Sequence, residues 1–158
     1  MEETAARSRE LAARTTMQKN IAYGPTVRRR MDIVFPSSPV AGAPLHMFIH
    51  GGYWRAGSKD AHTLVAAPVI AVGGIAAIVT YELMPQTRLG AIVGQIRQAA
   101  CFLQRLAPDL GADLNRFTVS GHSAGALAQT QTTLRADRIR VAVPLSIFDL
   151  DVQDSFRT

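Results

Sequence analysis

The sequence predicts an α/β protein with a mostly parallel, doubly wound sheet, and three observations support this fold class. Continuous apolar runs at 45–50 and 75–80 have the composition of strands buried on both faces of a sheet. A segment of helical periodicity follows the second run, and strands that alternate with helices form parallel sheets. A strand, a sharp turn and a helix over 116–135 add a third unit of the same kind.

Length and composition favour one domain with one core. A chain of 158 residues buries roughly two thirds of its extended surface on folding. The hydrophobic fraction of 47% and the charged fraction of 18% are typical of globular proteins, and no apolar run is long enough to span a membrane. The acidic start Met1-Glu2-Glu3 lacks a signal core, and Cys101 is the only cysteine. We therefore expect a cytoplasmic protein without disulfides, which does not act at a membrane.

The net charge of +5 comes almost wholly from arginine. The arginines are scattered singly except for Arg28-Arg29-Arg30, and no aromatic residues are interleaved with them as in nucleic-acid-binding surfaces. We interpret the arginines as a solvated basic surface, and the triplet, which precedes a strand, as a flank that blunts a sheet edge. Nucleic acid is therefore not an expected partner.

The amino-terminal segment is predicted to be separate from the main domain. Residues 2 to about 18 contain neither Pro nor Gly, which favours a helix with a thin apolar stripe. We divide the chain into a helical arm, 1–22, and a partial α/β domain, 23–158. Residues 31–35 alternate as the first strand, and a turn-rich loop follows at 36–44.

The remaining elements alternate along the chain. Residues 63–72 are predicted to form a helix that Pro68 interrupts or begins. Residues 88–107 carry apolar side chains at helical spacing and end before Pro108. A last strand is expected at 140–145, although Pro144 removes one hydrogen-bond donor from it.

One motif points to chemistry at the third unit. Gly121-His122-Ser123-Ala124-Gly125 contains Gly-x-Ser-x-Gly between a strand and a helix, which is the context of a nucleophile elbow. In such a turn the strained backbone lifts the serine hydroxyl above the sheet edge, and the glycines avoid collisions with the neighbouring strand or helix. Ser123 is therefore the candidate nucleophile. Taken alone, the motif also fits a glycine-rich turn with an N-cap serine.

A second motif follows the strand at 45–50. Two glycines at Gly51 and Gly52 allow backbone N–H groups to point into a cavity that side chains would block, as an oxyanion hole requires. An ordinary tight turn is the alternative interpretation. The order of the two motifs, with the Gly-Gly loop first, matches that of a hydrolase.

Together these motifs resemble the α/β-hydrolase superfamily, in particular its kynurenine formamidase (arylformamidase) and carboxylesterase branch. The residues that carry the resemblance are His50-Gly51-Gly52-Tyr53-Trp54, the Gly121–Gly125 motif, Tyr23-Gly24, Tyr81-Glu82-Leu83-Met84-Pro85 and Phe148-Asp149-Leu150. The likeness runs from about residue 22 to the end of the chain. It covers about the first half of such a fold, so we expect a truncated core without its last strands.

The resemblance implies roles for individual residues. Ser123 would attack the acyl or formyl carbonyl of a small aryl formamide or ester, and the N–H groups of Gly51, Gly52 and Ala124 would hold the oxyanion. Tyr53 and Trp54 either line the mouth of the substrate pocket or anchor the loop. No metal and no organic cofactor is implied.

The resemblance also implies a triad whose histidine follows the serine, and this part is not found. The histidines are His46, His50, His62 and His122, and all precede Ser123. Asp149 is the candidate acid, with a structural turn residue as the alternative. We therefore expect the amino-terminal half of a serine hydrolase, with little turnover by itself. The alternative is a non-catalytic module that binds small molecules.

The strand at 141–145 would lack its next parallel neighbour in such a chain. We therefore expect an exposed apolar edge that self-associates or pairs with a missing carboxy-terminal segment.

Overall fold

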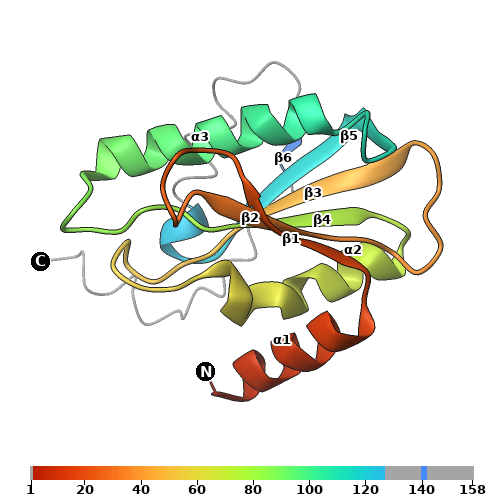
Figure 1. The fold of residues 1–158 in the computed structure, drawn as a ribbon, viewed down its shortest axis with the longest axis horizontal. Coiled ribbons are helices and arrows are strands. Elements are labelled where there is room, and N and C mark those ends of the chain that lie inside the picture. The colour runs from red at the N-terminus through yellow and green to blue at the C-terminus, as the bar shows by residue number, and fades with distance from the viewer. Residues whose placement is uncertain (1, 127–139, 142–158) are drawn as a thin grey trace, which may run out of the picture.

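The computed structural model describes residues 2–126, 140 and 141 (Figure 1). These residues form a six-stranded sheet in the order β1-β2-β4-β3-β5-β6. The strands are β1 (Met17–Ala22), β2 (Arg30–Val34), β3 (Ala43–Ile49), β4 (Ile75–Val79), β5 (Ala112–Gly121) and β6 (Arg140–Val141). The helices are α1 (Glu2–Arg14), the 3₁₀ helix η1 (Lys59–Ala66), α2 (Ala67–Ala71) and α3 (Leu89–Leu106).

The sheet is mostly parallel and its helices lie on both faces, which confirms the predicted fold class. Strands β4, β3, β5 and β6 pair in parallel, whereas β1 and β2 are antiparallel additions at one edge. Figure 1 shows α3 on one side of the sheet, and η1 and α2 on the other, with α1 beyond them. The connections from β3 to β4 and from β4 to β5 therefore cross opposite faces.

Hydrophobic side chains fill both faces of the sheet. The strand positions alternate between the two sides, as the period of two along a strand requires. The face under α3 carries the larger cluster, and the apolar stripe predicted for 88–107 supplies its helical half through Ile92, Ile96, Ala99 and Leu103. The opposite face packs Val34, Phe48, Ala66, Ala76 and Ile78 beneath η1 and α2.

Most predicted elements have the expected position. The strands at 31–35, 45–50 and 75–80 correspond to β2, β3 and β4, and α3 fills the predicted helix at 88–107. The helix predicted over 63–72 is divided: 3₁₀ geometry covers 59–66, and α2 begins with Pro68 in its first turn. Proline is accepted there because the first-turn N–H groups have no partner within the helix.

The amino-terminal segment differs from its prediction. The helix expected to about residue 18 ends at Arg14, and 17–22 form the edge strand β1 instead. An irregularity between Gln18 and Ile21, with Asn20 at φ 58°, breaks the alternation that would have marked this strand in the sequence. Helix α1 is also docked, because the fully buried Ser8 hydroxyl donates to the Ala61 carbonyl and accepts from the Leu64 amide, both at 3.1 Å.

The arginine triplet does not blunt a sheet edge, which corrects the sequence interpretation, because the strand that it precedes, β2, lies between β1 and β4. Two of its side chains bond backbone carbonyls instead. The Arg28 side chain donates to the carbonyls of Tyr81 (2.8 Å) and Gly57 (2.7 Å). The Arg30 side chain donates to carbonyls of the preceding loop, among them that of Thr26 at 2.9 Å. These guanidinium groups therefore donate hydrogen bonds to loop carbonyls in place of backbone N–H groups.

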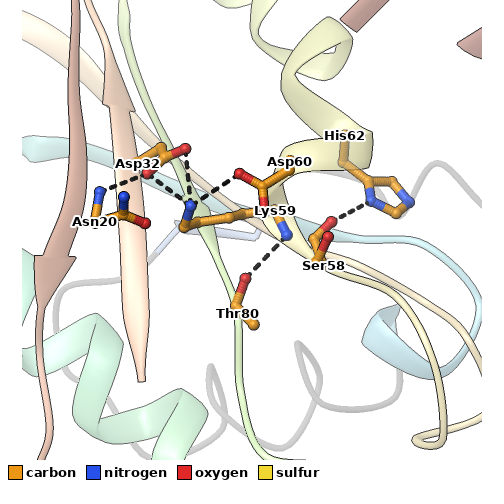
Figure 2. Close-up of polar contacts among 7 residues, drawn as sticks. All are labelled: Asn20, Asp32, Ser58, Lys59, Asp60, His62 and Thr80. Atoms are coloured by element: carbon orange, nitrogen blue, oxygen red, sulfur yellow. Dashed lines mark hydrogen bonds and ion pairs between the residues drawn. The ribbon is translucent and has the colours of Figure 1, made fainter. Parts of the chain in front are cut away.

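A buried ion pair joins η1 to the sheet (Figure 2). The Lys59 ammonium lies 3.1 Å from the Asp32 carboxylate of β2, and both side chains are almost fully buried. Asp32 also accepts the Asn20 amide of β1 at 2.7 Å, and the Lys59 amide donates to Thr80 Oγ1 at 2.9 Å. The Asp32 carboxylate and Lys59 thus connect β1, β2, η1 and the residue that follows β4.

Some expectations lie outside the described residues. The helix after Ser123 is described only as far as Ala126, and the strand at 140–145 only for its first two residues. The candidate acid Asp149 and the expected edge at 141–145 beyond Val141 stay predictions. Among the described helices, none is long and apolar enough to cross a membrane.

Candidate active site at the carboxyl ends of β3 and β5

The two motifs meet at the point where the strand order of the sheet reverses. Strand β3 lies between β4 and β5, which both follow it in the chain. In open α/β sheets the carboxyl ends of the strands at such a reversal form a crevice that binds ligands. The Gly-Gly loop leaves β3 there, and the serine turn leaves β5, with Ile49 paired to Gly121 across the strands.

Ser123 stands in a sharp turn between β5 and a helix. Its φ of 53° is in the left-handed region, which is uncommon for a residue with a Cβ. The turn is fixed on both sides, because the His122 amide donates to the Ile49 carbonyl (3.1 Å) and the Ala126 amide donates to the Ser123 carbonyl (2.9 Å). Ser123 itself is exposed. The turn therefore presents the serine to solvent at the positive end of the following helix.

The two outer glycines of the motif are required by packing, as predicted. A Cβ on Gly121 would overlap the backbone of Gly125 and lie 2.7 Å from the Ala126 nitrogen. A Cβ on Gly125 would overlap the carbonyl of Ile49 and lie 2.8 Å from that of His50. Both distances are shorter than the contacts that real Cβ atoms make. Glycine at these two positions therefore allows the start of the helix to lie against the ends of β5 and β3.

The Gly-Gly loop lies directly beside the serine turn. A Cβ built on Gly51 would lie 2.6 Å from the His122 carbonyl oxygen and 3.2 Å from the Ser123 Cβ. Gly52 has φ 117°, and a Cβ there would overlap the Ala56 carbonyl, which excludes any other residue. Gly51, Gly52, Ser123 and Ala124 are thus brought together in one place, although 70 residues separate the motifs.

Tyr53 and Trp54 take different positions. Both have positive φ, 52° and 62°, so the loop winds in a left-handed turn. Tyr53 is 85% exposed. The Trp54 side chain packs on the core cluster under α3, with its ring 5.8 Å from that of Tyr81, and the Trp54 carbonyl accepts the Met84 amide at 2.7 Å. The structure therefore places Trp54 as an anchor of the loop and Tyr53 at the surface.

Two buried aromatic side chains lie next to the Gly-Gly loop. His50 and Tyr81 are fully buried and their rings stack at 4.3 Å. The Tyr81 hydroxyl donates to the His50 carbonyl at 2.6 Å, and His50 Nδ1 donates to the Gly51 carbonyl at 2.7 Å. Burial lowers the pKa of His50 to about 4, so the ring is neutral at physiological pH. Burial likewise raises the pKa of Tyr81.

The other histidines bond different groups, although the His62 ring stacks on that of His50 with 5.7 Å between the centroids. His46 bonds Thr118 and Ser120 of β5, each at 2.7 Å, and burial lowers its pKa to about 4. His62 Nδ1 donates to the Ser58 carbonyl at 2.8 Å. His122 is exposed beside Gly51.

Several residues that hold the site were not singled out from the sequence. A Cβ on Gly57 would lie 2.6 Å from His50 Nδ1, so a glycine is needed for the loop to close over this ring. Arg28 bridges Gly57 to Tyr81, as described above. Glu82 accepts a hydrogen bond from Thr26. In the sequence, Gly57 is visible as a glycine shortly after the Gly-Gly loop, whereas no local pattern indicates the contacts of Arg28.

Comparison with known proteins places this site in a family. The model of the BD-FAE family matches residues 31–155, which is most of the chain. The kynurenine formamidase of Danio rerio is 32% identical over 108 residues, covering 68% of this chain and 35% of that protein. The isoprenylcysteine alpha-carbonyl methylesterase of Arabidopsis thaliana is 30% identical over 110 residues, covering 70% of this chain and 26% of that protein.

A solved structure agrees with the fold. A protein from Silicibacter sp. tm1040, named provisionally as a thioesterase, superimposes with a TM-score of 0.74 and 29% identity. The match covers 89% of this chain and 54% of the other. The resemblance to the α/β-hydrolase superfamily is therefore confirmed. The chain spans about a third or less of the length of these two curated relatives, and about half of that structure.

Proposed function

The chain belongs to the BD-FAE family, and from this premise we propose that it carries the nucleophile and the oxyanion hole of a serine hydrolase. The observation that supports this most strongly is the contact between the two motifs. A Cβ on Gly51 would lie 2.6 Å from the His122 carbonyl oxygen and 3.2 Å from the Ser123 Cβ, and Ser123 is exposed on a left-handed turn. A hydroxyl beside unblocked peptide groups is the arrangement that acyl transfer requires.

The proposed reaction begins with attack of Ser123 Oγ on the carbonyl carbon of a formamide or ester. The new O–C bond forms as the hydroxyl proton passes to a base, and the π electrons move to the carbonyl oxygen. The N–H groups of Gly51, Gly52 and Ala124 stabilise this oxyanion; each such donor is typically worth about 2.7–4 kcal/mol of barrier. Collapse expels the amine or alcohol with a proton, and water then releases the acid and restores the serine.

The base is the part that these residues do not supply. His46, His50 and His62 are hydrogen-bonded to Ser120, Gly51 and Ser58. His122 is exposed beside Gly51, but it precedes the serine, whereas the triad histidine that the resemblance implies follows the serine. We therefore propose that the 158 residues are slow both in acylation and in turnover, with the base supplied from another segment or chain. Loss of a triad base typically lowers kcat by about 10⁴–10⁶.

The proposed substrate class is a small aryl formamide or aryl ester. The support comes from the kynurenine formamidase and methylesterase relatives, whose names give an amide and an ester. Comparison of acylation by a matched aryl formamide and aryl ester, followed by mass spectrometry of the intact chain, distinguishes the two. Equal inertness toward both, in a chain that reacts with phosphonates, would overturn this assignment.

A fluorophosphonate probe tests the proposed nucleophile. We expect the probe to label the chain at Ser123 and to fail with Ser123→Ala. Ser120→Ala is the matched control, because Ser120 lies in β5 just before the serine turn, is buried, and has its hydroxyl 2.7 Å from a histidine nitrogen. Labelling that is lost with Ser120→Ala, or an inert Ser123 in a cooperatively folded chain, would contradict the proposal. The second outcome would favour a non-catalytic binding module.

A further inference from the structure

The peptide groups of the Gly-Gly loop are held from the protein interior. A trans peptide is planar, so the carbonyl of one residue and the N–H of the next point in opposite directions. The Tyr81 hydroxyl donates to the His50 carbonyl at 2.6 Å, and this carbonyl shares its peptide with the Gly51 N–H. His50 Nδ1 donates to the Gly51 carbonyl at 2.7 Å, and this carbonyl shares its peptide with the Gly52 N–H. The peptide that carries each proposed oxyanion donor is therefore held at its carbonyl by one buried side chain.

The two side chains are themselves held in place. Their rings stack with 10° between the planes, and neither is accessible to solvent. Gly57 closes against the edge of the His50 ring, and Arg28 ties Gly57 to the Tyr81 carbonyl. The hydrogen-bonding side chains thus have little freedom to turn away from the loop.

From these contacts, and resting on the function proposed above, we propose that Tyr81 and His50 are positioning residues that aim the Gly51 and Gly52 N–H groups at the substrate oxygen. Neither side chain touches the reacting atoms. Glycine peptides rotate more freely than others, so donors on two successive glycines need an external constraint to be ready before the reaction. The buried phenol and imidazole supply that constraint.

The proton on His50 is fixed by the same contacts. A carbonyl only accepts, so the bond to Gly51 places the ring hydrogen on Nδ1. Among the described atoms, Nε2 is buried and has no hydrogen-bond partner. A side chain with an N–H at the position of Nδ1 should therefore keep the hydrogen bond to the Gly51 carbonyl, whereas a side chain with its N–H at the position of Nε2 should lose it.

The first test compares two tyrosine variants by the rate of fluorophosphonate labelling at Ser123. Tyr81→Phe keeps the ring and removes the hydroxyl. Tyr23→Phe is the matched control, because Tyr23 is also buried and donates at 2.6 Å to a backbone carbonyl, that of Thr80. We expect a fall of about tenfold or more for Tyr81→Phe, and less than twofold for Tyr23→Phe. Equal rates in the two variants would overturn the proposal.

The second test uses the geometry of the side-chain amides. In His50→Asn the amide N–H takes the place of Nδ1, and in His50→Gln it lies near Nε2. We expect His50→Asn to keep the labelling rate within about threefold and His50→Gln to lose about tenfold or more. Indistinguishable rates would overturn the proposal. If Tyr81→Phe does not unfold cooperatively, the comparison of His50→Asn with His50→Gln still tests the proposal.

A third measurement does not depend on reactivity. His50-Gly51 is the only His-Gly step in the sequence, so ¹³C-carbonyl histidine with ¹⁵N-glycine identifies the Gly51 amide in a single NMR spectrum. We expect this resonance to move in Tyr81→Phe and to stay in Tyr23→Phe; an unmoved resonance would overturn the inference. If Ser123 of the unaltered chain is not labelled, the proposed function fails, and this spectrum still tests the positioning.

Discussion

At the residue scale, backbone strain is concentrated at the candidate site. Within residues 2–126, the non-glycine residues with positive φ are Asn20, Tyr53, Trp54 and Ser123. Such conformations cost on the order of 1–3 kcal/mol each and persist where the surrounding structure imposes them. Around the loop, the Gly52 carbonyl accepts the amides of Arg55 and Ala56 at 2.9 and 3.0 Å. Three of the four strained residues therefore adjoin the proposed reaction centre.

Gly51→Ala tests the close approach of the two motifs. The added Cβ would lie 2.6 Å from the His122 carbonyl, so the loop or the serine turn must shift. We expect labelling of Ser123 by a fluorophosphonate to fall by about tenfold or more, because the donors move away from the reacting oxygen.

The control for this variant is Gly94→Ala in α3, where a Cβ meets nothing within 4 Å. We expect an unchanged labelling rate and a gain in stability of up to about 1 kcal/mol, measured by thermal unfolding, because alanine is the better helix former. A Gly51→Ala chain that reacts as fast as Gly94→Ala would show that the two motifs do not act together.

The sequence could predict the residues of the site better than their supports. Gly51, Gly52 and Ser123 lie in short motifs whose glycines have a steric purpose that can be read locally. The contributions of Tyr81 and Arg28 depend on carbonyl groups 31 and 29 residues away, and no local pattern reports such pairs. The division of roles between Tyr53 and Trp54 likewise depends on which ring reaches the core.

At the element scale, the Lys59–Asp32 ion pair connects η1 with β2 across the sheet. Asp32 interrupts an otherwise apolar strand, and from the sequence it read as the polar position of an alternating strand. Its partner is 27 residues away, at the start of a helix that was expected to begin later. Strands with clear apolar runs and the stripe of α3 were predictable because their signals are periodic, whereas β1 and this pair are fixed by tertiary contacts.

Lys59→Met should leave the Asp32 carboxylate buried without its counter-ion. We expect a loss of about 3–5 kcal/mol in the free energy of unfolding, measured with urea. Removing one partner of a buried ion pair leaves the other charge out of water without compensation. Adding Asp32→Asn should recover part of this loss, because an amide oxygen still accepts the Asn20 N–H.

Arg14→Ala is the comparison for this pair. It breaks the ion pair with Glu10 at 2.8 Å, in which both side chains are mostly exposed. Exposed pairs contribute up to about 1 kcal/mol. If Lys59→Met costs no more than Arg14→Ala, the buried pair has no special role in holding η1.

At the scale of the whole molecule, two neutral histidines, the buried His50 and the half-buried His46, couple folding to pH. Burial lowers the pKa of both His46 and His50 from 6.5 to about 4. Between these values the unfolded chain binds protons that the folded chain excludes, so stability falls as the pH drops from about 6.5 to about 4. Above pH 6.5 this penalty is absent. The loss is on the order of 3 kcal/mol per histidine.

His46→Gln should therefore flatten the pH dependence of unfolding in that window. We expect the slope of the free energy against pH to decrease by up to about 1.4 kcal/mol per pH unit, the contribution of one proton. His122→Gln, at an exposed histidine, should leave the slope as it is. Parallel urea-unfolding profiles for His46→Gln and the unaltered chain would contradict this assignment.

The hydrogen bonds of Arg28 also matter for anyone who shortens the chain. The family match starts at residue 31, so a boundary chosen from it would discard Arg28, whose side chain bonds the far end of the loop at Gly57 and the Tyr81 carbonyl. We expect residues 31–158 to label at Ser123 more slowly than residues 17–158, which lose α1 but keep the Arg28 contacts with the loop. A boundary taken from the family match alone would thus remove a side chain that supports the reactive turn.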